Sequence, residues 1–192
     1  MVRKASRSDI PSIIELLHQV NMVHHELRPD LFKPYTTKYD EEELEALLGD
    51  ESKPVFVYED GEGLTESLAE TGASAGTSGA NTGTGGYAPG TILGHAFCMV
   101  TEARDHRLLQ DIKTLYIDDI CVDEKARGKH VGKALFDYVR DYARSIGCNN
   151  ITLNVWEGNA PALSFYRNMG MNVQKTTMEM LITENTVRKK IS

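Results

Sequence analysis

Apolar and polar positions along the chain alternate between two periods, which predicts a mixture of helices and strands. Apolar residues recur at helical spacing over residues 10–27, 40–48, 135–146 and 160–169. Short apolar runs predict strands over residues 2–5, 54–58, 91–101, 113–122 and 150–155, and a weaker alternation predicts one or two more strands over 172–182. Predicted strands and helices therefore follow one another along almost the whole chain.

Two stretches interrupt this pattern. Residues 59–90 are rich in Gly, Ser, Thr and Ala, and they lie between two predicted strands. Such a composition cannot bury enough apolar surface to offset its ordering entropy, so we expect a flexible insertion in a hairpin. Residues 183–192 read as a polar tail. We expect a single domain over residues 1–182.

The composition leaves the predicted helices and strands unchanged, but it disfavours several classes of protein. The chain has 192 residues, 41% of them hydrophobic, and a formal net charge of −7. This charge disfavours a general nucleic-acid binder and is compatible with a cationic substrate. Three cysteines without C-x-x-C spacing indicate reduced thiols in the cytoplasm, and neither they nor the histidines suggest a metal site. The sequence shows no signal peptide and no run of membrane-spanning length, so no membrane association is expected.

Residues 115–147 hold the most informative pattern in the chain. An apolar run is followed by a basic, glycine-bearing loop and then by a helical pattern, which suits an anion because the first turn of a helix offers free N–H groups. Arg127, Lys129 and Lys133 add positive charge. A P-loop is excluded because only three residues separate Gly128 from Gly132 and no Ser or Thr follows Lys133. The dinucleotide-binding pattern G-x-G-x-x-G fails as well.

Two motifs do fit. Residues 127–132 match R-x-x-G-x-G/A, with His130 at the position of the first glycine. Residues 159–171 match N-x-x-A-x-x-x-Y-x-x-x-G-F, with Met171 in place of the final aromatic residue. The motifs start about thirty residues apart and in the same order as in the GNAT family of N-acetyltransferases, which the chain therefore resembles. A backbone N–H survives at His130, and histidine tolerates unusual backbone angles.

The resemblance implies a fold and a cofactor. The fold is α/β in three layers, with a central, mixed, mostly antiparallel sheet that splays in a V shape and helices on both of its faces. The cofactor is acetyl-CoA, used as a co-substrate, with no metal. The residues implied in binding it are Ile120, Cys121, Val122, Arg127, Gly128, Lys129, His130, Val131, Gly132, Lys133, Asn159, Ala162 and Tyr166.

Acetyl transfer to an amine also needs a proton donor for the thiolate and a base for the amine. By resemblance Tyr166 is the general acid. Asp118 is the first candidate for the base, followed by Glu157 and then Asp119. Neighbouring strand residues face opposite sides, so only one of the two aspartates is expected in the acceptor slot.

In the resembled family the loop after the first helix forms one wall of this slot, which implies Phe32, Tyr35 and Tyr39 as substrate-binding candidates. Asp119 is an alternative contact to a cation. Cys121 as an acyl-enzyme nucleophile is disfavoured, since no histidine is placed beside it by sequence.

The expected function is direct transfer of acetyl to a primary amine in a ternary complex. The acceptor is a polyamine, another small cationic amine or a peptide amine. The alternative is a non-catalytic acyl-CoA-binding sensor module. The resemblance also favours a homodimer.

Overall fold

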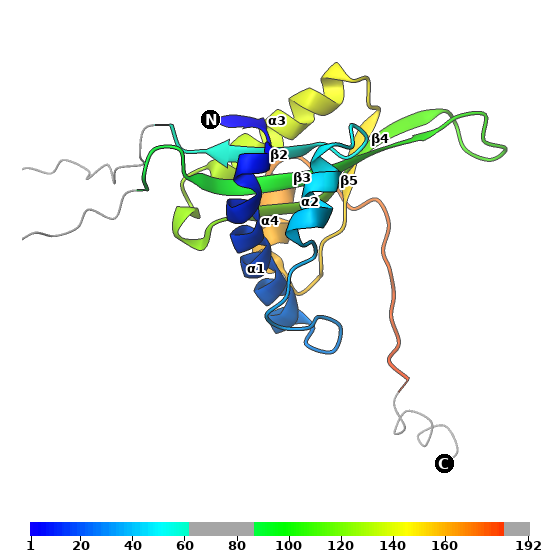
Figure 1. Ribbon diagram of the computed structural model, residues 1–192. Helices are drawn as coiled ribbons and strands as arrows, with labels where there is room; N and C mark the ends of the chain where they lie inside the picture. Colours follow the sequence, from blue (N-terminus) through cyan, green and yellow to red (C-terminus); the bar gives the residue numbers. More distant parts are fainter. Residues whose placement is uncertain (62–86, 183–192) are drawn as a thin grey trace, which may run out of the picture. The chain divides into compact units, whose positions relative to one another are not determined.

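The computed structural model describes residues 1–61 and 87–182 (Figure 1). Contacts within the chain divide it into two compact units, Met1–Asn159 and Ala160–Ser192, and each is described by itself. The expected insertion at 59–90 lies largely outside the described residues, and the tail at 183–192 lies wholly outside them. In the described part of the chain, no helix is long and apolar enough to cross a membrane.

The first unit is built on a five-stranded sheet with the strands in sequence order. β1 (Val2–Lys4), β2 (Val55–Glu59), β3 (Ile92–Ala103) and β4 (Ile112–Val122) pair antiparallel, and β5 (Asn150–Leu153) pairs parallel with β4. The mixed, mostly antiparallel sheet is thus confirmed, as is the hairpin of β2 and β3 that brackets residues 60–91.

The two central features of the sheet both lie in β4. It pairs with β5 only over residues 114–117, so within residues 1–61 and 87–182 its second half, 118–122, pairs with β3 alone. The register with β3 also shifts there: Phe97 faces Asp119, whereas Cys98 faces Ile117, which leaves Asp118 as an extra residue. This is a β-bulge, and it coincides with the point where β4 and β5 part.

Helices cover both faces of this sheet (Figure 1). α1 (Ile10–Leu27) and α2 (Glu41–Leu48) pack on one face, where Ile13, Leu17 and Leu44 join Val57 and Phe97 in the core. Asp40 caps α2 by accepting a hydrogen bond from Glu43 N–H at 2.8 Å, as its sequence predicts.

α3 (Val131–Ser145) covers the other face. Its hydrophobic side buries Val131, Leu135 and Val139, and Phe56 of β2 packs edge-on against Tyr138 and Tyr142, with ring centroids 5.1 and 5.0 Å apart. The helix is followed by Gly147 at φ +75°, the left-handed position predicted for a glycine at its end.

The start of α3 lies unusually close to the sheet because Gly94 of β3 has no side chain. A Cβ at this position would lie 2.7 Å from the backbone oxygen of Cys121 and 3.0 Å from Leu135 Cδ1. The glycine therefore sets how closely the first turns of α3, and the loop before them, approach β4.

The second unit holds α4 (Ala160–Asn168), which ends in a left-handed Gly170 with a hydrogen bond from Met171 N–H to Tyr166 O at 3.0 Å. The strand expected over 172–182 is wrong, because these residues form neither helix nor strand. Weak alternation cannot specify a strand without a neighbouring strand to pair with. Its large apolar side chains are exposed: Val173, Met178, Met180, Leu181 and Ile182.

The close approach at Gly94 can be tested by substitution. We expect Gly94→Ala to lower the free energy of unfolding by about 1–3 kcal/mol, because the backbone of Cys121 and the start of α3 must move apart. Urea denaturation measures the change. Gly49→Ala is the matched control, since its φ is −82° and the nearest atom to an added Cβ is 3.4 Å away. Equal stabilities of the two variants would contradict the role given to Gly94.

Candidate active site

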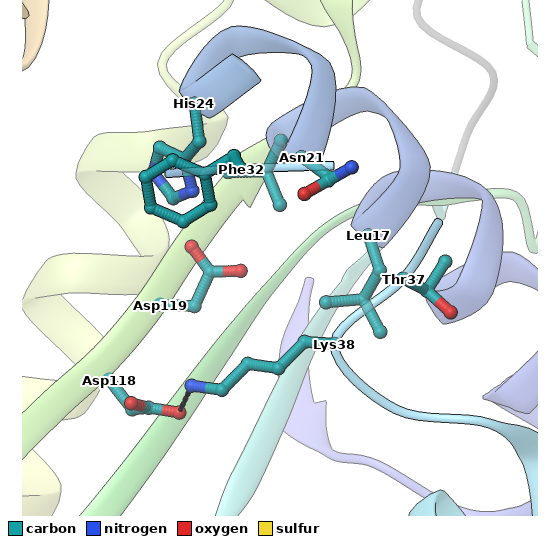
Figure 2. A pocket seen from close by; sticks show the side chains of 9 residues that line it. Leu17, Asn21, His24, Phe32, Thr37, Lys38, Asp118 and Asp119 are labelled. Atoms are coloured by element: carbon teal, nitrogen blue, oxygen red, sulfur yellow. Dashed lines mark hydrogen bonds and ion pairs between the residues drawn. The ribbon is translucent and has the colours of Figure 1, made fainter. Parts of the chain in front are cut away.

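A pocket of about 290 Å³ opens on the α1 face of the sheet, beside the bulge in β4 (Figure 2). Its walls come from α1, from the loop between α1 and α2, and from β4. The lining residues are Leu17, Val20, Asn21, His24, Phe32, Thr37, Lys38, Asp118 and Asp119. An apolar pocket with a few charged groups is typical of a small-molecule site.

Both aspartates line this pocket, so the expectation that only one of them could do so is wrong. The physical reason is the bulge. Strict alternation of side chains holds only along a regular strand, and the extra residue at Asp118 resets it. As a result Asp119 lies on the α1 face together with Phe97, its partner on β3, and Asp118 opens onto the same pocket.

Asp118 is held by a cation from the chain itself. Lys38 reaches across the pocket to place Nζ 2.5 Å from Asp118 Oδ2, and Tyr39 Oη lies 3.5 Å from the same oxygen (Figure 2). Partial burial lowers the pKa of Lys38, but its hydrogen bond to Asp118 and the nearby negative charges raise it more, so the net shift is upward. Lys38 therefore stays protonated at neutral pH.

Asp119 has a different partner. His95 of β3 is fully buried, and its Nε2 lies 3.2 Å from Asp119 Oδ2. Nδ1 of His95 is buried and has no hydrogen-bond partner within residues 1–61 and 87–182. If Nδ1 of His95 carried the proton, a buried N–H would lack a partner, and this costs more free energy than a buried lone pair without a partner. The tautomer in which Nε2–H donates to Asp119 is therefore favoured. The carboxylate of Asp119 points toward the space below Phe32 and His24 (Figure 2).

Phe32 forms the aromatic wall of the pocket. Its ring lies 5.0 Å from that of His24 and meets Trp156 edge-on at 5.8 Å. Tyr35, the second aromatic residue expected here, is 84% exposed at φ +56° and does not line the pocket. Glu157 is exposed on the loop after β5 and does not line it either.

The loop between β4 and α3 has the geometry of an anion site. Gly128 and His130 both adopt left-handed backbone angles, with φ +79° and +61°, and His130 is the N-cap of α3. The first helical hydrogen bond runs from Ala134 N–H to His130 O at 3.0 Å. The N–H groups of Val131, Gly132 and Lys133 lie in the first turn, before this hydrogen bond, and have no acceptor within the helix. They can donate to an anion bound at the helix N-terminus.

The basic side chains of this loop are differently placed. Arg127 is exposed. Lys133 pairs with Asp137 one turn along α3, Nζ to Oδ2 2.5 Å, and Lys129 Nζ lies 5.5 Å from the centroid of the Tyr87 ring. Arg127 is therefore an exposed charge of this loop, whereas Lys133 is engaged by an ion pair and Lys129 lies over an aromatic ring.

Gln19 of α1 fixes the start of this loop. Its Nε2 donates to Asp123 Oδ2 at 2.9 Å, and its Oε1 accepts from Glu124 N–H at 3.0 Å. The hydroxyl of Tyr87 donates to the other oxygen of Asp123. Burial raises the pKa of Asp123, but these hydrogen bonds outweigh it and hold the pKa below its usual value. One helix thus supports both the pocket and the loop.

The segment between the pocket and the loop is residues 120–122 of β4. Ile120 and Val122 face α3, opposite Ala96 and Gly94, and Cys121 is buried with its Sγ 3.3 Å from Leu16 O. Their backbone edge lies beyond the end of the β5 pairing. An extended ligand that runs along this edge meets strand-like donors and acceptors.

The remaining predicted cofactor residues lie near the end of the chain. Asn159 is the last residue of the first unit, and its N–H donates to Trp156 O at 2.9 Å. Ala162 and Tyr166 lie on α4 in the second unit, where both are partly buried and the Tyr166 ring packs edge-on against Phe165 at 5.2 Å.

The sequence did not predict the contributions of Lys38 and Gln19 to the site, nor the pairing of His95 with Asp119. Lys38 and Asp118 are 80 positions apart, and nothing local marks them as a pair. His95 could have been placed opposite β4 from the hairpin register alone, but not on a given face. Within the described residues, no group of three or more His, Cys, Asp and Glu side chains could hold a metal ion.

Comparisons with known proteins agree with this geometry. A mutant of the BH1408 protein from Bacillus halodurans has a solved structure with a TM-score of 0.77, 25% identity, and coverage of 95% of this chain and 99% of its own. Streptothricin acetyltransferase from Streptomyces lavendulae is 43% identical over 56 residues, which are 29% of this chain and 30% of that protein.

Glucosamine 6-phosphate N-acetyltransferase from Arabidopsis thaliana is 32% identical over 66 residues, 34% of this chain and 42% of that protein. The matched part spans less than half the length of both curated relatives. The family model matches a longer part of the chain, residues 20–171, which include the anion loop, α4 and every lining residue of the pocket except Leu17. The chain belongs to the acetyltransferase (GNAT) family.

Proposed function

We propose that this protein transfers an acetyl group from acetyl-CoA to the primary amine of a small acceptor by direct attack in a ternary complex. The observation that carries the proposal is the position of Asp119: a carboxylate in a pocket beside the part of β4 that lies beyond its pairing with β5, in a chain of the acetyltransferase family. Amine, thioester and base can then meet at the point where β4 and β5 part.

Residues 127–133 fit the pyrophosphate of acetyl-CoA. The N–H groups at the start of α3 and the charges of Arg127 and Lys129 offer donors to a dianion. The backbone of 120–122 would pair with the pantetheine arm, and its N–H groups would polarise the thioester carbonyl. Asn159 and Ala162 are assigned to the same arm by the family motif. Acetyl-CoA supplies the activated acetyl group.

Asp119 is the base that the geometry favours, ahead of Asp118 and Glu157. One oxygen of Asp119 is held by His95 and its carboxylate points into the pocket, whereas Asp118 Oδ2 is engaged by Lys38. Glu157 lies outside the pocket. In the proposed step Asp119 takes a proton from the acceptor ammonium, and His95 acts as a positioning residue that fixes the carboxylate.

The neutral amine then attacks the thioester carbon. A C–N bond forms, the C–S bond breaks, and the thiolate of CoA takes up a proton. Tyr166 is proposed as the donor of that proton, on the strength of the family motif at 159–171. The excess proton on the amide nitrogen leaves with solvent.

The pocket supports a small cationic acceptor. It has a volume of about 290 Å³ and carries two carboxylates against one lysine. A polyamine, another small amine or the end of a peptide lysine all have this chemistry, and the two curated relatives are named for acetylating streptothricin and glucosamine 6-phosphate. A non-catalytic acyl-CoA sensor would have no need of a carboxylate at this position. Cytoplasmic location and a homodimer remain predictions.

The role of Asp119 can be tested by turnover. We expect Asp119→Asn to lower the rate of CoA release with a small-amine panel by about 10²–10⁴-fold, because the base is lost while the shape of the side chain is kept. Thiol detection after mixing acetyl-CoA with the amines measures the rate. Calorimetry should show unchanged acetyl-CoA affinity.

Glu157→Gln is the control, with turnover expected to equal that of the wild type, since this side chain is exposed outside the pocket. Equal turnover of Asp119→Asn would remove Asp119 from the mechanism. Tight binding of acetyl-CoA without turnover of any amine by the wild type would favour the sensor instead.

Direct transfer predicts that Cys121 takes no part. Burial raises the pKa of its thiol to about 12, and the same holds for Cys98. Since the thiolate is the nucleophile, both should stay unreactive at pH 8. We expect iodoacetamide to modify the less buried Cys148 first in the folded protein, as mass spectrometry of tryptic peptides would show. An acetylated Cys121 after incubation with acetyl-CoA would argue for an acyl-enzyme.

A further inference from the structure

We propose that Lys38 is a specificity-determining residue that occupies Asp118 with its own ammonium group, so that the pocket offers an acceptor one free carboxylate. The inference rests on the proposed function for the identity of the pocket as an acceptor site. It adds the class of acceptor: a primary amine that brings a single positive charge into the pocket, rather than a short diamine.

Lys38 lies on the loop between α1 and α2, and its side chain extends across the pocket to Asp118 (Figure 2). The side chain of Lys38 is 48% exposed and that of Asp118 is 27% exposed. The pair therefore sits at the mouth of the pocket, in the position where a second cationic group of an acceptor would come to rest.

The charge of the pocket determines how many ammonium groups of an acceptor find a carboxylate partner. Asp118 and Asp119 contribute two negative charges, and Lys38 contributes one positive charge. His95 lies behind Asp119, and Tyr39 faces both Lys38 and Asp118, with Lys38 Nζ 5.4 Å from the centroid of the Tyr39 ring. Lys38 pairs with Asp118, whereas the partner of Asp119 is the imidazole of His95, so Asp119 is the carboxylate left for an acceptor. This matches one ammonium group in the acceptor.

The second ammonium group of an acceptor would compete with Lys38 for Asp118. The acceptor can use Asp118 only if it displaces Lys38, which is tethered beside Asp118 and is therefore present at a high effective concentration. This exchange replaces the ion pair between Lys38 and Asp118 with one between the acceptor and Asp118, so it adds little to the affinity for the acceptor. Removal of Lys38 should change this, because a short diamine could then pair with both carboxylates.

The test is a titration that does not depend on turnover. Full-length protein is titrated, without acetyl-CoA, with 1,4-diaminobutane and with butylamine, and binding is followed by NMR chemical-shift changes. In Lys38→Met we expect the affinity for 1,4-diaminobutane relative to butylamine to rise by about fivefold over the wild type, the size of a half-exposed ion pair.

Three further variants make the result specific to the ion pair. Lys33→Met removes the same charge from an exposed position of the same loop and should leave the ratio of affinities unchanged. Lys38→Arg keeps the cation and should keep the wild-type ratio. In an Asp118→Asn background, Lys38→Met should have no further effect on the ratio of affinities, because the carboxylate with which Lys38 pairs is absent.

Two outcomes would overturn the proposal. One is an unchanged ratio in Lys38→Met, which would make the ion pair a surface contact without influence on the acceptor. The other is the absence of binding of either amine to any variant. Failure of the proposed function appears differently, as the expected change in amine binding without acetylation of any amine.

Discussion

The β-bulge at Asp118 is the constraint on which the site depends. β4 must pair with β3 along its length, yet it leaves β5 after residue 117, and the extra residue absorbs the change of direction. The bulge turns Asp118 and Asp119 toward one pocket, and residues 120–122 continue beyond the pairing with β5. It also leads β4 into the loop that precedes α3. A regular strand would send one aspartate to the opposite face, against α3.

The two aspartates acquire different chemistry from their partners. Asp118 meets an ammonium at the half-exposed mouth of the pocket, whereas Asp119 meets a buried imidazole from the neighbouring strand. A carboxylate already paired with a fixed cation is suited to setting charge, and one held by a hydrogen bond from a buried group is suited to moving a proton. The division of roles that we propose for the two aspartates would follow from which loop or strand faces each residue.

Much of this architecture could be predicted from the sequence, because it depends on local signals. Helix limits followed capping residues such as Asp40 and glycines such as Gly147, and the left-handed His130 agrees with the tolerance expected of histidine. The bulge could not be predicted, since one extra residue in an apolar run leaves no local mark. Neither could the ion pair between Lys38 and Asp118, nor the lack of a strand at 172–182, because pairing depends on distant residues.

The proposed binding of acetyl-CoA by the loop at 127–133 can be measured by calorimetric titration. We expect the wild type to bind acetyl-CoA and Arg127→Ala to weaken binding by about tenfold or more, through loss of a charge-assisted contact to phosphate. Arg107→Ala, an exposed arginine in the loop between β3 and β4, should bind as the wild type does. Absence of acetyl-CoA binding by the wild type, or equal affinity of Arg127→Ala, would contradict the account.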